Sequence, residues 1–279
     1  MSKNTGARRT KGTAGLIFLV GVCALLALPI YWMVVASLKG VGEPPSAWLP
    51  AQLSFQNFRE VLDTIPLGRM YFNSAFTSVA AATIQVGFAL PMAYAFARIS
   101  LPGKRFLFLA VLSTMFVPEE MKLIPNFLLV SGLQWTDTYA ALIFPVAAHA
   151  FPVFVLHEHI RRLPREQFEA GAVDGASHFR LLRTVVVPQS GGLLMGLWMV
   201  ALVGRWNDYL WPLVVIEKPE MQPLTVGLAY LKNMESAGLE WGRLMAGAVL
   251  TALPLAIVFA LFQRYFTGVG IASRPGTRV

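Results

Sequence analysis

Charged residues are scarce in this chain. Asp, Glu, Lys and Arg make up only 14% of its 279 residues, whereas a soluble domain normally has about 25%. Hydrophobic residues account for 56% of the chain, and the mean hydropathy is +0.57. This composition excludes a surface that faces water on all sides and predicts a polytopic membrane protein.

Cysteine is almost absent. The single Cys23 lies within an apolar run, so neither an intrachain disulfide nor a cluster of thiolate ligands can form. The sequence His157-Glu158-His159 does not indicate a metal site, because side chains two positions apart on a helix point in different directions. No recognisable nucleophile motif is present either. We therefore predict no metal site and no catalytic residue.

A phosphate-binding loop is also missing. Gly103-Lys104 is the only Gly-Lys pair, and it lacks both the earlier glycine and the following hydroxyl residue of such a loop. Any ATP must therefore be bound by a different subunit. The net charge of +8 does not predict a nucleic-acid partner, because the cations follow a membrane pattern.

Long apolar runs are what the sequence has in abundance. Each of six runs is long enough to cross a bilayer, which takes about 20 helical residues. The runs lie at residues 14–38, 72–97, 106–128, 138–157, 190–216 and 244–266. The first exceeds the apolar part of a cleaved signal peptide, so we expect a retained helix. The predicted fold is all-α with six transmembrane helices and membrane lipid around them.

The distribution of Lys and Arg predicts the orientation. With the N-terminus in the cytoplasm, fifteen of the 23 cations fall in cytoplasmic segments and six in outer ones. Both termini are then cytoplasmic. We expect three parts: residues 1–71 (tail, first helix and outer loop), a five-helix core at 72–266 with a cytoplasmic loop at 161–189, and a cytoplasmic tail at 267–279.

Charges interrupt the third run. Glu119 and Lys122 are three positions apart and are expected to pair on one helix face. A charge at the bilayer centre is costly, so two interpretations remain open. The pair marks a helix end at the membrane boundary, or it lines a water-filled pathway.

The loop at 161–189 is too patterned to be a slack linker. Pro164 is suited to open a helix, and Asp174-Gly175 is suited to a turn, since glycine tolerates a positive φ. A second short helix is expected to end at Pro188. The loop either enters a groove on a partner or lies on the membrane face.

The order of residues in this loop resembles the EAA loop of ABC importer permeases, in which the loop couples the permease to a cytoplasmic ATPase. The resemblance implies that seven residues form the coupling site: Glu169, Ala170, Gly171, Asp174, Gly175, Ala176 and Pro188. Gly171 departs from the family pattern, which usually has alanine there.

Other segments resemble the carbohydrate-type permeases, which include the second membrane subunit of maltose-type transporters. They run in the right order along nearly the whole chain: Phe55–Phe58, Asn73-Ser74, Ala93–Arg98, Trp206–Leu213, Pro223–Ala229 and Gln263–Phe266. The resemblance implies the type I ABC importer fold, in the plasma membrane of a bacterium or archaeon, and a cargo of sugars or related polyols.

The same resemblance implies the partners. These are a second, related permease in a heterodimer, two ATPase subunits that bind ATP-Mg, and an external solute-binding protein, while this chain binds no cofactor. A secondary transporter and an integral-membrane enzyme are the alternatives.

Polar and aromatic side chains in the fifth run are candidates for the translocation pathway, together with Glu119 and Lys122. They are Asn207, Asp208, Tyr209 and Trp211. Amide, carboxylate and aromatic groups suit the hydroxyls and ring faces of sugars. The alternative is that these side chains brace the helices against one another.

Overall fold

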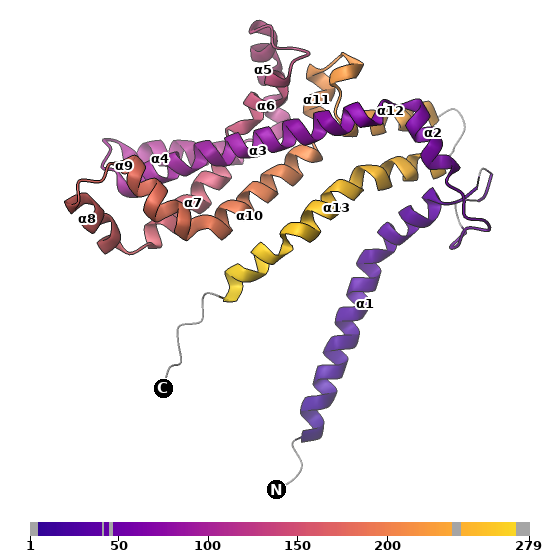
Figure 1. Cartoon of the computed structure of the whole chain (residues 1–279), viewed down its shortest axis with the longest axis horizontal. Coiled ribbons are helices and arrows are strands. Elements are labelled where there is room, and N and C mark those ends of the chain that lie inside the picture. Colours follow the sequence, from indigo (N-terminus) through magenta and orange to yellow (C-terminus); the bar gives the residue numbers. More distant parts are fainter. Residues whose placement is uncertain (1–4, 41, 45–46, 236–240, 272–279) are drawn as a thin grey trace. The chain divides into compact units, whose positions relative to one another are not determined.

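The regular secondary structure of the described residues is entirely helical. The computed structural model describes residues 5–40, 42–44, 47–235 and 241–271, and gives only the backbone of residues 5–14, 233–235 and 264–271. Every regular element within these ranges is a helix (Figure 1). The predicted all-α class is confirmed. Residues 272–279 of the expected tail, and Lys3 at the other end, lie outside the described residues.

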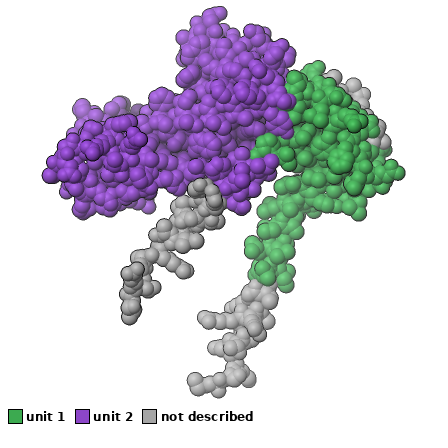
Figure 2. Space-filling model, viewed as in Figure 1, with its two compact units in different colours: residues 1–67, 228–254 green, residues 68–227, 255–279 purple. Residues whose placement is uncertain are grey.

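The chain divides into two compact units (Figure 2). Unit 1 consists of Met1–Leu67 and Leu228–Pro254, and unit 2 of Gly68–Gly227 and Leu255–Val279. The elements are, in order, α1 (Thr5–Ser37), α2 (Gln56–Thr64), α3 (Leu67–Arg98), α4 (Lys104–Ser113), η1 (Thr114–Phe116), α5 (Glu119–Gly132), α6 (Tyr139–Ala147), α7 (Ala150–Arg162), α8 (Arg165–Val173), α9 (His178–Leu181), η2 (Leu182–Val186), α10 (Val187–Trp206), α11 (Leu210–Val215), η3 (Pro219–Met221), α12 (Leu224–Glu235) and α13 (Trp241–Ile271).

Four helical stretches are long and apolar enough to cross a membrane. They are Gly15–Ser37, Leu67–Arg98, His178–Trp206 and Trp241–Gln263. The pair α6 and α7 forms a fifth candidate that is bent by 44°. These stretches match five of the six predicted runs, although the fifth run is shifted, because its helix ends at Trp206 and not at residue 216.

The third predicted run, 106–128, is not one helix. A single-turn 3₁₀ helix, η1, follows α4, Val117 then takes an extended conformation, and α5 begins at Glu119, directly after Pro118. Proline has no N–H to continue the helical hydrogen bonds and disfavours helix in the residue before it, so the break falls at Val117-Pro118.

Unit 1 has an ordered loop after α1. The side-chain amide of Asn57, in the Phe55–Phe58 segment, donates to the carbonyls of Ser37 (3.0 Å) and Lys39 (2.8 Å). Glu43 accepts three backbone N–H bonds, from Gly40, Ala51 and Gln52. Asn57 therefore satisfies carbonyls at the end of α1 that have no partner within that helix.

The core of unit 2 packs α3 against α7, α8 and α10. Buried residues of this core include Ala93, Leu156, Ile160, Phe168 and Leu197. A smaller cluster joins Ala82 of α3 to Ala201 and Leu202 of α10. In lipid the hydrophobic effect gives little force between helices, so small residues that permit close approach help to hold such a bundle together.

Asn73 and Ser74 fasten the start of α12 to α3 and α6. Asn73 is fully buried, and its amide donates to the carbonyls of Glu220 (2.9 Å) and Gln222 (3.1 Å) while its oxygen accepts from the Tyr139 hydroxyl (2.8 Å). Ser74 accepts the N–H of Leu224 at 2.8 Å, at the first residue of α12. The Asn73-Ser74 segment thus has a clear structural role.

Three short helices, α5, α6 and α11, form a group of their own within unit 2 (Figure 1). Val130, Leu142, Trp211 and Val215 are buried in it. Asp137, just before α6, binds the segment that follows α11: its carboxylate accepts the N–H groups of Lys218 (2.9 Å) and Glu217 (2.7 Å). These bonds favour the charged form and hold the pKa of Asp137 below its usual value.

We expect Asn73→Ala to lower the free energy of unfolding by about 1–3 kcal/mol, because it leaves two carbonyls and the Tyr139 hydroxyl without their partner. Tyr139→Phe removes only one of the three bonds and should cost less. Thermal unfolding in detergent measures both. Equal midpoints for Asn73→Ala and the wild type would show that this network does not stabilise the fold.

Candidate functional site

The loop at 161–189 forms two short helices joined by a tight turn. Pro164 is the residue before α8, as its position predicted, and α8 ends at Val173. Gly175 then takes a positive φ of 70°, and Ala176 donates its N–H to the carbonyl of Gly171 at 2.9 Å. The conformation expected for Gly175 is confirmed, because the turn lies in the left-handed region that glycine adopts without a steric penalty.

The predicted helix end at Pro188 is wrong. The chain continues as helix from His178 to Trp206 and passes through the wide turn η2 just before Pro188. Proline cannot donate the hydrogen bond that a regular α-helix requires, and a local π-turn accommodates that loss without breaking the helix. Pro188 is exposed near the start of α10.

Gly171, where the loop departs from the family pattern, lies at a close contact. A Cβ atom there would come within 2.5 Å of the Leu181 side chain. Leu181 is buried in the core of unit 2. The absence of a side chain at Gly171 therefore lets α8 approach the start of the following helix closely. This close packing offsets the lower helix stability of glycine, which costs up to about 1 kcal/mol relative to alanine.

Two side chains at the end of α3 attach this loop to unit 2. Nη2 of Arg98 donates to the carbonyls of Ile160 (2.8 Å) and Leu163 (2.7 Å), and its guanidinium lies 4.1 Å from the ring centre of Phe168. The Tyr94 hydroxyl and Nδ1 of His178 are 3.1 Å apart. The end of α7, α8 and α9 are all held by one turn of α3.

The outward side of the loop is exposed and carries both acids and apolar groups. Val173 is 88% exposed and Phe179 74% exposed. Glu169 and Asp174 are exposed too, and neither carboxylate has an ion pair among the described residues. A loop that exposes both apolar side chains and carboxylates is suited to bind a protein surface that has an apolar groove with basic side chains around it.

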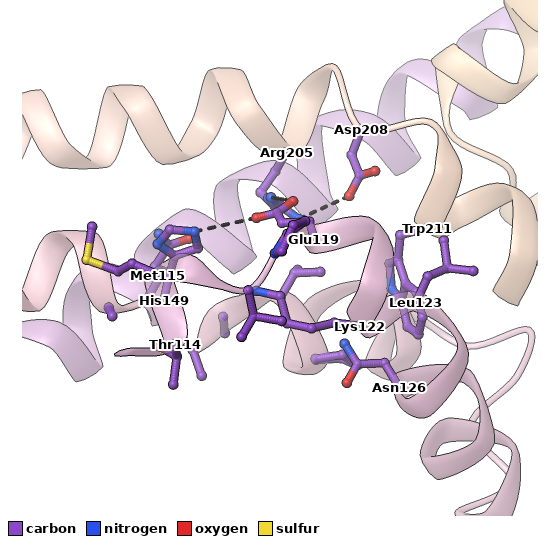
Figure 3. A pocket seen from close by; sticks show the side chains of 18 of the residues that line it. Thr114, Met115, Glu119, Lys122, Leu123, Asn126, His149, Arg205, Asp208 and Trp211 are labelled. Atoms are coloured by element: carbon purple, nitrogen blue, oxygen red, sulfur yellow. Dashed lines mark hydrogen bonds and ion pairs between the residues drawn. The ribbon is translucent and has the colours of Figure 1, made fainter. Parts of the chain in front are cut away.

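A second candidate site is a cavity of about 920 Å³ in unit 2. Its walls come from α3, α4, η1, α5, α6, α7, α10 and α11 and from the non-helical residues between them. Figure 3 shows side chains that line it. Predicted pathway residues that line it are Glu119, Lys122, Asp208 and Trp211. The volume lies in the range of binding sites for small molecules.

Arg205 connects the charged groups of this cavity (Figure 3). Its guanidinium donates to Asp208 at 3.0 Å and to Glu119 at 3.4 Å. Glu119 in turn lies 3.4 Å from Nε2 of His149, whose Nδ1 accepts the N–H of Phe151. A neutral His149 with its proton on Nε2 satisfies both contacts. Glu119 lies in the first turn of α5 and Arg205 in the last turn of α10, where helix dipoles favour these charges.

The predicted pair between Glu119 and Lys122 is not formed. Glu119 follows the break at Pro118 and its carboxylate contacts Arg205 and His149 rather than a residue of its own helix. Asn207 and Tyr209 do not line the cavity; Asn207 is exposed and donates to the carbonyl of Val203.

Trp211 has a second contact besides the cavity. Its indole N–H donates to the carbonyl of Ala141 at 2.8 Å, within the α5–α6–α11 group. The bracing alternative therefore applies to Trp211, while Asp208 faces the cavity with its carboxylate held by Arg205.

Sequence reasoning missed four residues of the two sites. Arg205 precedes Asp208 by three positions, a helical pairing distance that could have indicated their contact. Tyr94 and Arg98 belong to a segment with a recognised pattern but without an assigned role. No local sequence pattern indicated a role for His149, because its contact with Glu119 joins positions thirty residues apart.

Comparison with known proteins gives consistent matches. Residues 5–267 match the model of a family described as binding-protein-dependent transport system inner membrane component. The sn-glycerol-3-phosphate transport system permease protein UgpE of Brucella abortus (strain 2308) is 29% identical over 261 residues, which cover 90% of this chain and 92% of that protein.

Two further matches extend the comparison. The arabinooligosaccharides transport system permease protein AraQ of Halalkalibacterium halodurans is 32% identical over 218 residues, covering 78% of this chain and 77% of that protein. A chain in the crystal structure of a bacterial ABC transporter involved in the import of the acidic polysaccharide alginate shares the fold, with a TM-score of 0.81 at 22% identity, over 95% of this chain and all of that chain.

We expect Arg98→Met to loosen α8, because it removes two charge-assisted hydrogen bonds and the contact with Phe168. A loss of about 2 kcal/mol corresponds to amide exchange in residues 165–173 that is about 30-fold faster. Arg98→Lys should lie between this variant and the wild type.

Hydrogen exchange followed by mass spectrometry measures the effect. The matched control is Arg162→Met, which removes an exposed cation at the same junction. Equal protection of α8 in the wild type and in Arg98→Met would contradict an attachment through Arg98.

Proposed function

The chain belongs to the family of binding-protein-dependent transport system inner membrane components, and from this premise we propose that its loop at 161–189 couples solute import to a separate ATPase. The resemblance that the EAA-like loop predicted is confirmed by the family match. The chain is thus a permease subunit of an ABC importer and not an enzyme.

One observation carries the coupling proposal. Val173, Phe179, Glu169 and Asp174 of the loop are exposed, while Phe168 and Leu181 anchor the loop in the core. A segment that is exposed toward a partner and fixed toward the bundle can pass a displacement on to the helices. The coupling residues in this proposal are those of the resemblance, with Ala170, Ala176 and Pro188 among them.

Helix α10 gives the displacement a direct route. The loop continues without interruption from His178 into the long helix that ends at Trp206. At that end Arg205 contacts Asp208 and Glu119 in the large cavity. A push on α9 therefore reaches the cavity through one rigid element, as expected of rigid-body switching.

The large cavity is our candidate for this subunit's share of the translocation pathway. Glu119, Lys122, Asp208 and Trp211 line it, and Asn207 and Tyr209 lie at the adjoining break. Relatives are named for sn-glycerol-3-phosphate and arabinooligosaccharides. We infer a cargo of sugars or related polyols, since carboxylate, amide and indole groups suit hydroxyl-rich molecules.

Membership of this family also supports a proposal for the topology and the partner subunits. We propose six transmembrane crossings in a type I fold with both termini in the cytoplasm, the broken segment from α4 to α5 being the third. The partners are a related permease, two ATPase subunits with ATP-Mg, and an external solute-binding protein, in a bacterial or archaeal plasma membrane.

Co-purification tests the proposed function directly. A P-loop ATPase should accompany the purified chain in constant proportion, and reconstituted vesicles should take up solute only with ATP and the binding protein. A pure single chain that transports without ATP would instead be a secondary transporter.

We expect Glu169→Lys to leave insertion intact and to weaken retention of the ATPase by about tenfold, because it reverses a charge on the docking surface. ATP-driven uptake should fall with it. The matched control is Glu217→Lys, an exposed acid outside the loop. Unchanged uptake and ATPase content in Glu169→Lys would exclude a docking role for this residue.

A further inference from the structure

A smaller cavity, of about 340 Å³, lies beside the coupling loop and has no role in the proposed function. The end of α3, the start of α4 and the last turns of α7 enclose it. Its lining includes three cations and two phenyl rings: Lys104, Arg105, Arg161, Phe96 and Phe108. His157 completes the wall, with its ring 4.2 Å from that of Phe108.

The charge of this cavity is positive. Arg161 is partly neutralised by Glu158 at 3.3 Å, and Glu158 also contacts His157. The ammonium of Lys104 donates to the carbonyl of Ile99 at 3.0 Å and has no ion pair among the described residues. Arg105 is exposed and has no polar partner in the part of the chain that the structure describes. Two uncompensated cations beside a hollow favour a phosphate group.

The surface next to the cations is apolar. None of the residues of α4 is buried in the described chain, and Phe106 is 76% and Leu109 54% exposed. A free phosphate ion makes no favourable contact with an apolar surface, whereas the acyl chains of a lipid do. We propose that this cavity binds the headgroup of an anionic phospholipid whose chains lie along α4. Basic pockets between membrane helices on the cytoplasmic side suit such headgroups.

A lipid bound in this cavity would lie next to the residues that attach the coupling loop. The cavity shares α7 and the end of α3 with the attachment of the coupling loop, where Arg98 contacts Ile160 and Leu163. A bound headgroup bridges α4 to α7 and so stabilises the wall from which α8 is held.

Native mass spectrometry of the intact transporter tests the proposal. The complex is purified from nanodiscs that contain equal amounts of phosphatidylglycerol and phosphatidylcholine of the same chain length. We expect phosphatidylglycerol to be retained preferentially, and Arg105→Gln to lower its retention about fivefold. Lys104→Gln combined with Arg105→Gln should lower it further, while Arg105→Lys should restore it. Arg162→Gln, on α7 but outside the cavity, is the matched control.

Each outcome decides between sources of the phosphate group. Equal retention of both lipids, or no loss in Arg105→Gln, would overturn the proposal. Displacement of the lipid by millimolar inorganic phosphate would show that the site takes a free anion, which overturns the lipid assignment. Lipid retention is measured without transport, so its failure leaves the proposed function untouched.

Discussion

The contact between Arg98 and the end of α7 is the interaction on which the position of the loop at 161–189 depends. The carbonyls of Ile160 and Leu163 lie at the C-terminal end of α7, where the regular helical hydrogen bonds run out. One guanidinium donates to both, and the Ile160 carbonyl also accepts the N–H of Leu163. The same group covers Phe168 and so fixes α8 against α3. A flexible linker in this place would absorb any displacement, whereas the coupling that we propose requires an attachment of this kind.

The large cavity is bordered by places where the surrounding helices are interrupted. Three interruptions, at Val117-Pro118, Ala148-His149 and Asn207–Tyr209, all border it. Backbone that is not helical is tolerated in a membrane only where protein buries it or where it lines a water-filled cavity. The breaks also supply helix ends, at which Glu119 and Arg205 are favourably placed. The partly charged lining of this cavity therefore comes from short helices that a simple apolar run does not reveal.

Many of the helices and the turn in the loop at 161–189 could be predicted from local sequence patterns. Apolar runs located the helices, and Gly175 indicated the turn, because both signals lie within a few residues. The π-turn before Pro188 was missed because it depends on how α9 and α10 join. Partners of Glu119 were also missed, since His149 and Arg205 reach it only in the folded chain. Gly171 departs from the family pattern, and its reason is a contact that local sequence does not show: the Leu181 side chain occupies the space of a Cβ atom there.

The exposed side chains of this loop form the surface that we propose meets the ATPase. Cross-linking from a single cysteine tests it, because Cys23 is the one native thiol and is removed by Cys23→Ser. In that background Val173→Cys, with a short bifunctional reagent, should give a cross-linked band with the ATPase that ATP alters. Leu53→Cys, an exposed residue far along the chain from the loop, should give none. Absence of the band at Val173, or an equal band at Leu53, would contradict the coupling role of this loop.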